Sequence, residues 1–238
     1  MTTLFISDLH LDGTRPHITS LFETFVREEA SQASALYILG DLFEAWIGDD
    51  AVDETGERVA AALAALHARG VPTFYIHGNR DFLLGDAYAR RARMTLLPDP
   101  SVIGIEGERV LLMHGDTLCT DDAPYQAFRA QSRTAAWQRA FLARPVAERQ
   151  AFAAQARVES ARYTRSVADA ITDVNNEAVV AALREYDVSR LIHGHTHRPK
   201  RHAIVLDGEV AERIVLGDWY EQGSALRVSP SIANLGTI

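Results

Sequence analysis

The sequence predicts an α/β fold interrupted by a helical insertion. In the first half of the chain, short apolar runs of strand length alternate with segments of helical period. The last third contains a hairpin pattern, and the segment between these two parts is helical throughout. Apolar residues make up 47% of the 238 residues, which is enough for one sizeable core and excludes a disordered or collagenous protein.

The core elements follow one another in a regular order. Five apolar runs predict buried strands at Thr3–Ser7, Ala35–Leu39, Thr73–His77, Val110–Met113 and Arg190–Ile192. Helices are predicted over Ile18–Ala33 and Arg58–Arg69. Near the end, a hairpin and one further strand are predicted over Ala203–Leu206, Arg213–Leu216 and Ala225–Ser229, with Asp207-Gly208 as the turn. These elements fit a mixed sheet, or two sheets packed face to face with outer helices.

The insertion covers residues 119–187, and we expect it to form a cap on a core made of residues 1–118 and 188–238. Its predicted helices are Pro124–Arg144, Pro145–Ile171 and Val174–Tyr186, the last with Asp173 as N-cap. One face of the second helix carries Phe152, Ala156, Tyr163, Val167, Ala170 and Ile171. Residues 121–170 contain eight arginines against five acidic residues, so the cap is basic in an acidic chain.

Charge and cysteine content restrict the setting in which the protein works. The formal net charge of −8 argues against a general nucleic-acid-binding protein, because phosphate contacts need a basic surface. The only cysteine, Cys119, allows no intrachain disulfide, which favours a reducing compartment. We see no signal-peptide pattern and no apolar run of the roughly 18 residues that span a bilayer. We therefore expect a cytoplasmic protein, and a monomer.

Polar side chains follow every one of the five core strands. In an open α/β sheet the ligand crevice lies outside the carboxyl ends of the strands, so we expect these side chains to converge. They are Asp8, His10, Asp41, Asn79, His114, His195 and His197. Any one fragment is a weak signal, but five in order, each ending a predicted strand, are unlikely to arise by chance. We assign no role to the remaining histidines or to Gly217-Asp218, and we expect Cys119 to be a buried small residue.

Nitrogen and oxygen ligands without thiolate suit Mn²⁺, Fe, Zn²⁺ or Co. Seven ligands are too many for one ion and suit two ions, an arrangement typical of phosphoester hydrolysis. In extended backbone, the paired side chains of Asp8-x-His10 and His195-x-His197 would point the same way. The glycines before Asp41, Asn79 and His195 would let the backbone approach closely. We hypothesise that Asp41 bridges two ions. One ion would be held by Asp8, His10 and His197, and the other by Asn79, His114 and His195.

The pattern Asp-x-His, Gly-Asp, Gly-Asn, His, Gly-His-x-His resembles the calcineurin-like metallophosphoesterases. That resemblance implies a four-layer α/β/β/α sandwich carrying a dinuclear metal site at these positions. Longer matches resemble the UDP-2,3-diacylglucosamine diphosphatases of lipid A biosynthesis, and they lie at residues 40–50, 78–85, 114–122 and 193–199. The resemblance implies hydrolysis of the pyrophosphate bond of UDP-2,3-diacylglucosamine with two Mn²⁺ ions. Attack on the α-phosphorus would give UMP and 2,3-diacylglucosamine 1-phosphate, by a protein bound peripherally to the cytoplasmic face of the inner membrane.

Substrate contacts are also implied by the resemblance. The positions that match are Asn79, Arg80, Asp122, Ser160, Thr164 and His195. Many superfamily members have His where this chain has Arg80; a permanent cation suits a pyrophosphate, whose sugar 1-phosphate leaving group needs little protonation. We therefore expect Arg80 and Asp41 to be catalytic. Family members often carry Asn at Thr164 and Lys at Val167, and Arg162 or Arg165 is a candidate to supply the missing cation.

Three other functions are open alternatives. One is a different metallophosphoesterase, such as a cyclic-nucleotide or nucleotide-sugar phosphodiesterase, which Arg80 and the cap disfavour. A second is a metal-free binding scaffold on the same fold, which the complete ligand set disfavours. A third is a nucleic-acid phosphoesterase, which the negative net charge of the chain disfavours.

Overall fold

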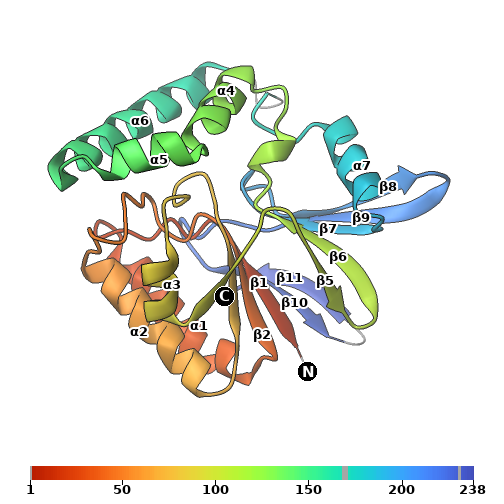
Figure 1. Ribbon diagram of the computed structural model, residues 1–238. Coiled ribbons are helices and arrows are strands. Elements are labelled where there is room, and N and C mark those ends of the chain that lie inside the picture. Colours follow the sequence, from red (N-terminus) through yellow and green to blue (C-terminus); the bar gives the residue numbers. More distant parts are fainter. Residues whose placement is uncertain (1, 168–170, 230–231) are drawn as a thin grey trace.

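Two β-sheets packed face to face form the centre of the computed structural model, which describes residues 2–167, 171–229 and 232–238 (Figure 1). The first sheet contains β1 (Thr3–Ile6), β2 (Ala35–Leu39), β3 (Thr73–Ile76), β4 (Met94–Leu97), β10 (Ser224–Ser229) and β11 (Ile232–Thr237), in the order β11-β10-β1-β2-β3-β4. The second contains β5 (Ser101–Ile105), β6 (Glu108–Met113), β7 (Arg190–His193), β8 (Lys200–Leu206) and β9 (Glu209–Val215), in the order β5-β6-β7-β9-β8. The predicted hairpin is confirmed as β8–β9.

Helices cover the outer face of each sheet. The first sheet carries α1 (Pro16–Glu28), α2 (Glu54–Ala68) and α3 (Asp86–Ala92), and the second carries α7 (Asn176–Glu185). The alternation of side chains along a strand explains the layers. In β1, Leu4 and Ile6 pack against the helices, whereas Phe5 packs against the second sheet. The predicted α/β/β/α order is therefore confirmed.

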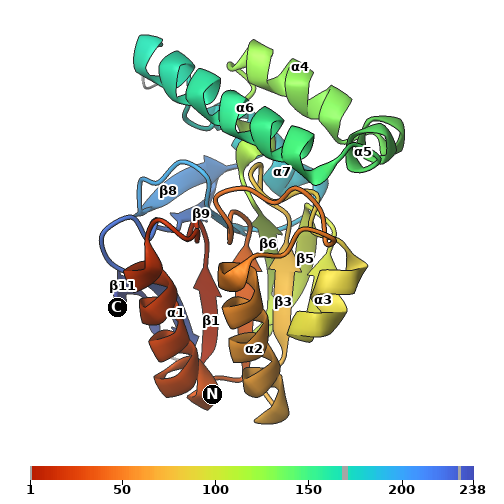
Figure 2. The same ribbon diagram turned by 90° about the vertical axis from the view of Figure 1, so that its left-hand side faces the viewer.

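Three further helices lie above the carboxyl ends of the strands (Figure 2). They are α4 (Ala123–Ser132), α5 (Ala135–Leu142) and α6 (Val146–Ser166). The range expected to form the cap also includes α7, but Val179 and Leu183 of that helix are buried beside Leu191 of the second sheet. None of the helices in the described ranges combines the length and apolar character needed to cross a membrane.

Several predicted helix ends are wrong, and side-chain caps explain two of them. The helix predicted over Pro124–Arg144 is divided, because Thr134 caps the start of α5 by accepting from Trp137 N at 3.2 Å. The N-cap of α7 is Asn175 instead of Asp173, since its side chain accepts from the first backbone amides of that helix. Helix α1 ends at Glu28 and gives way to a 3₁₀ turn over Ala30–Gln32.

The helix predicted to extend to Ile171 ends at Ser166 as α6. Residues 168–170, which include Ala170 of the expected apolar face, lie outside the described residues.

Candidate metal centre

All seven candidate ligands meet at one rim of the two sheets. Strands β1, β2 and β3 run parallel, as do β6 and β7, so their carboxyl ends point to the same side. Each candidate ligand follows one of these ends. Residues up to 189 positions apart in sequence are thereby brought within a few ångströms of one another.

One half of the rim contains Asp8, His10 and His197. Asp8 Oδ1 lies 3.3 Å from His197 Nε2, and the two imidazole Nε2 atoms lie 3.1 Å apart. Asp8 Oδ1 is buried and has no hydrogen-bond partner among the described residues. A buried carboxylate oxygen facing two ring nitrogens is a donor set that fits a divalent cation.

The other half of the rim is centred on Asn79. Its Oδ1 lies 2.8 Å from His114 Nε2 and 2.8 Å from His195 Nδ1. Asp41 stands between the halves, with Oδ2 3.9 Å from His10 Nε2 and Oδ1 3.8 Å from His114 Nε2. The carboxylate of Asp41 can therefore reach a cation in either half.

The backbone at the rim is left-handed, so the prediction of extended backbone at the Asp-x-His and His-x-His pairs is wrong. Five of the seven residues have φ between 49° and 69°: Asp8, His10, Asp41, His195 and His197. Left-handed backbone costs a non-glycine residue roughly 1 kcal/mol, and it persists where surrounding contacts over-determine it. Such contacts are present, because His195 N donates to Asp8 Oδ2 at 2.8 Å and His10 N donates to Asp41 O at 2.9 Å.

Two glycines allow the chain segments of the rim to approach one another. A Cβ atom at Gly78 would lie 2.1 Å from Asp41 Oδ1, and one at Gly194 would lie 2.3 Å from Asp8 Oδ2. No side chain fits at either distance, which agrees with the close approach expected from the sequence.

The electrostatics of the rim divide the histidines into two groups. Burial lowers the pKa of His10 to about 4 and that of His195 to about 3, so both rings are neutral at pH 7. Burial acts the same way on His114, but the carboxylates of Asp41 and Asp116 outweigh it and raise its pKa to about 9. Although burial opposes ionisation, the charge of His197 holds the pKa of Asp8 far below its usual range.

Three carboxylates that the sequence analysis did not single out orient the candidate ligands. Asp81 is buried and accepts from Asp41 N, Phe43 N and Gly78 N, so it holds two rim loops together. Glu44 Oε2 lies 2.9 Å from His10 Nδ1, and Asp218 Oδ2 lies 3.6 Å from His197 Nδ1. Carboxylates behind metal-binding histidines are common. Asp81 and Glu44 belong to the quoted motifs, whereas nothing in the sequence distinguished Asp218.

The expected substrate residues that are not also candidate metal ligands come from the core loop that holds Arg80 and from the cap. Arg80 N donates to Asp41 Oδ1 at 2.8 Å, and its side-chain Nε is buried without a hydrogen-bond partner in the described part of the chain. Asp122 caps α4 and accepts from Tyr163 Oη at 3.1 Å. Ser160 lies on α6 one turn before Tyr163, and Thr164 is exposed at the next position beyond it.

Aromatic side chains of the cap and of the loop after Arg80 pack against one another. Trp137 stacks on Phe141 with ring centroids 4.9 Å apart, and Phe152 approaches both rings. Phe82, from the loop after Arg80, lies 6.0 Å from the Trp137 ring and beneath the Arg133 guanidinium. We call Phe82, Phe128, Trp137, Phe141 and Phe152 the aromatic cluster.

Comparison with known proteins assigns the family. Residues 1–199 match the model of the calcineurin-like phosphoesterases. A UDP-2,3-diacylglucosamine hydrolase of Stenotrophomonas maltophilia is 56% identical over 245 residues, covering 100% of this chain and 99% of that protein. The hydrolase of the same name from Xanthomonas axonopodis pv. citri is 55% identical over 242 residues, covering 99% of this chain and 98% of the relative.

The chain belongs to the calcineurin-like phosphoesterases. The family implies divalent metal binding, and the rim contains two groups of residues that could hold a metal ion: Asp8, His10 and His197, and Asp8, Asp41 and His114. The alignments with the two relatives cover the cap as well as the core. Among solved structures, an archaeal phosphodiesterase aligns over 100% of both chains with 12% identity and a TM-score of 0.49.

Proposed function

We propose that the chain hydrolyses the pyrophosphate bond of UDP-2,3-diacylglucosamine and releases UMP and 2,3-diacylglucosamine 1-phosphate, a step of lipid A biosynthesis. The observation that carries this proposal is identity of 55–56% over the full length with hydrolases named for that substrate. The identity spans the rim, where phosphate chemistry would occur, and the cap, where the acyl chains would bind. Water would attack the α-phosphorus.

The rim side chains would hold two cations, which we take to be Mn²⁺. The set assigned to one cation is Asp8, His10 and His197, and the set assigned to the other is Asn79, His114 and His195. Asp41 would serve both, since its two oxygens face the two halves of the rim. When bound, the cations would polarise the phosphoryl oxygens and supply a water nucleophile at neutral pH. Two of the four imidazoles are neutral before a cation binds, because burial keeps His10 and His195 unprotonated at pH 7.

Arg80 would neutralise the charge that develops on the phosphates as the bond breaks. Its backbone is fixed by the bond to Asp41, and its charge is close enough to contribute to the low pKa of His10. A guanidinium can donate two parallel hydrogen bonds to a phosphate. A sugar 1-phosphate is a weak base, so electrostatic stabilisation matters more than proton donation for its departure.

The remaining substrate contacts would come from Asn79, Asp122, Ser160, Thr164 and His195. The hydrogen bond from Tyr163 to Asp122 supports a position for these α6 residues facing the rim. The acyl chains would lie on the aromatic cluster, which offers apolar surface next to Arg80. Exposed apolar side chains on the cap support peripheral contact with the cytoplasmic face of the inner membrane, namely Phe128, Leu142, Phe152 and Val158. We take the protein to act as a monomer and without nucleic acid.

A UMP-release assay tests the proposal. Purified protein would be given the diacylated substrate or UDP-N-acetylglucosamine, with Mn²⁺ or with a chelator. We expect turnover of the diacylated substrate only, lost with chelator and restored by Mn²⁺. In ¹⁸O-water the label should enter UMP. Equal turnover of both UDP-sugars, or label in the sugar phosphate, contradicts the proposal.

A further inference from the structure

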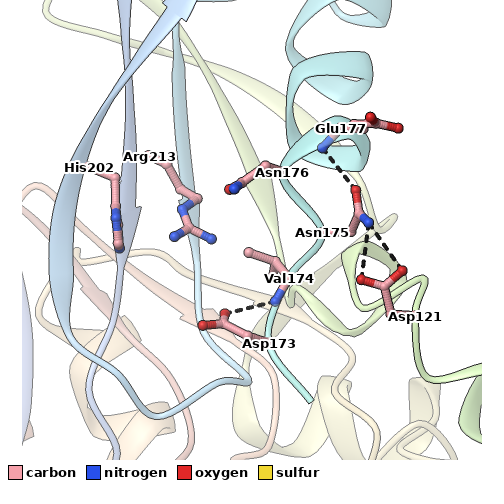
Figure 3. A pocket seen from close by; sticks show the side chains of 8 residues that line it. All are labelled: Asp121, Asp173, Val174, Asn175, Asn176, Glu177, His202 and Arg213. Carbon is pink, nitrogen blue, oxygen red and sulfur yellow. Dashed lines mark hydrogen bonds between the residues drawn. The ribbon is translucent and has the colours of Figure 1, made fainter. Parts of the chain in front are cut away.

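A cavity lies beside the second sheet, and no proposed ligand or substrate residue lines it (Figure 3). Its volume is about 520 Å³, within the range of pockets that hold small organic ligands. It lies between β8, β9 and the first residues of α7. The side chains of His202, Arg213 and Asn176 border it.

Arg213 is the unusual member of this cavity. The residue is 6% exposed, and its Nη1 atom has no hydrogen-bond partner among the described residues. No described carboxylate lies within ion-pair distance of it. Burial of a cation without a partner is costly, and it lowers the pKa of this guanidinium. A buried, unpaired guanidinium that lines a cavity of this size points to an anionic ligand.

Three carboxylates line the cavity: Asp121, Asp173 and Glu177. The Glu177 side chain points away from Arg213 (Figure 3). The charge of Asp173 acts on Arg213, but the first two carboxylates are hydrogen-bonded to other groups. Asp173 accepts from Val174 N at 2.7 Å and from Arg198 Nη1 at 2.9 Å. Both oxygens of Asp121 lie 3.1 Å from Asn175 Nδ2. These bonds hold the two carboxylates in place and leave the Arg213 guanidinium available to a ligand.

Two further groups favour an oxyanion beside Arg213. His202 is paired with Arg213 in the register of β8 and β9, so the two side chains stand next to each other on one face of the sheet. Asn176 is the first residue of α7, a ten-residue helix whose N-terminal end carries partial positive charge. The amide of Asn176 extends toward the guanidinium across the cavity (Figure 3).

We propose that this cavity is a binding site for a phosphate group, held by Arg213, His202 and Asn176. The site is separate from the rim, and its assignment does not depend on the proposed hydrolysis. Arginine matches the geometry of phosphate oxygens, and a helix N-terminus is a frequent phosphate site. The ligand is either inorganic phosphate or a phosphomonoester, since both present the same oxygens.

Calorimetric titration of the full chain with inorganic phosphate and with glucose 1-phosphate tests the site. The variants are Arg213→Met, which keeps an apolar stem, and Arg201→Met as a matched control. Arg201 lies on the neighbouring strand and is already paired with Glu212. We expect Arg213→Met to weaken binding at least about tenfold, the scale of one charge-assisted hydrogen bond, and Arg201→Met to leave it unchanged. The tighter of the two ligands identifies the natural source.

Asn176→Asp is a second variant that does not depend on a buried substitution. Asn176 is exposed, and an aspartate there would give Arg213 a carboxylate partner. We expect it to weaken phosphate binding by about the same factor and to raise the melting temperature. Equal affinity in wild type and Arg213→Met, no binding at millimolar phosphate, or tighter binding of acetate than of phosphate would overturn the proposal.

Discussion

Arg149 of α6 and Asp50, in the loop before α2, form a bidentate ion pair that joins the cap to the core. Arg149 Nη1 lies 2.8 Å from Asp50 Oδ1, and Nη2 lies 2.5 Å from Oδ2. Nη1 also donates to Ile47 O, and Nε donates to Arg144 O at 3.1 Å. Arg149 is 1% exposed although it belongs to a helix that is otherwise largely in contact with solvent. Arg149 therefore helps to hold α6 over the rim, together with Arg157, whose Nη1 donates to Glu44 O at 2.9 Å.

Replacing Arg149 with Ala should loosen the cap. We expect the free energy of unfolding to fall by about 1–3 kcal/mol, because the substitution leaves Ile47 O and Asp50 without their donor. The KM for the diacylated substrate should rise more than kcat falls. Urea unfolding and steady-state kinetics measure the two effects. Arg139→Ala, an exposed arginine on α5, is the control and should change neither.

Replacing Asp41 with Ala should abolish both metal loading and turnover. Asp41 is the carboxylate that faces both halves of the rim, so we expect kcat to fall at least about a thousandfold. Elemental analysis of the purified variant should find fewer than two ions per chain. Near-normal activity with two bound ions would refute the bridging role.

Replacing Arg80 with Ala should separate chemistry from metal binding. We expect turnover to fall about 10²–10³-fold, the usual cost of removing one group that stabilises transition-state charge. Metal content should stay at the wild-type level, because Arg80 contacts Asp41 through its backbone amide. The turnover of Arg80→Lys should lie between those of wild type and Arg80→Ala, because lysine keeps the charge but lacks the paired donors. Unchanged kinetics in Arg80→Ala would remove Arg80 from the mechanism.

Metal uptake should be coupled to proton release. The pKa of His114 is about 9 in the metal-free site, because Asp41 and Asp116 outweigh the effect of burial. A ligating imidazole must be neutral, so at pH 7 binding should release at least one proton, and the affinity should rise as pH approaches 9. Calorimetry in two buffers of different ionisation enthalpy measures the proton count. An affinity that does not change between pH 7 and 9 would contradict the assignment of His114.

The thiol of Cys119 should be inert in the folded protein. It is 1% exposed, and burial raises its pKa to about 12. At pH 8 only about one thiol in ten thousand is ionised, and the thiolate is the reactive form. Ellman's reagent should therefore react slowly with native protein and rapidly after unfolding in guanidinium. Since the chain has no other cysteine, the signal is unambiguous; prompt reaction of native protein would show that the segment opens.

The strands that carry the rim could be predicted because each is a short apolar run followed by a polar group. β2 agrees with its prediction at both ends, and β1, β3 and β7 agree within one residue. The elements α3, β4, β5 and β11 were not predicted. Each of these elements is short: α3 has seven residues, β4 four and β5 five, so neither the helical nor the strand period is sustained.

The supporting groups of the rim could not be predicted from spacing. Asp218 comes to His197 only because β9 runs beside β7, a contact that no local pattern encodes. The left-handed backbone at Asp8 and His197 was also missed, since long-range contacts override the extended preference of residues near strands.

The left-handed backbone at the rim has a consequence for protein engineering. Five candidate ligand positions hold non-glycine residues in a conformation that glycine or asparagine adopts at lower cost. A library screened only for heat resistance should therefore accumulate those two residues at Asp8, His10, Asp41, His195 and His197. The selected variants would have higher melting temperatures but no catalytic activity. Any effort to stabilise this protein against heat therefore needs a selection for catalysis as well.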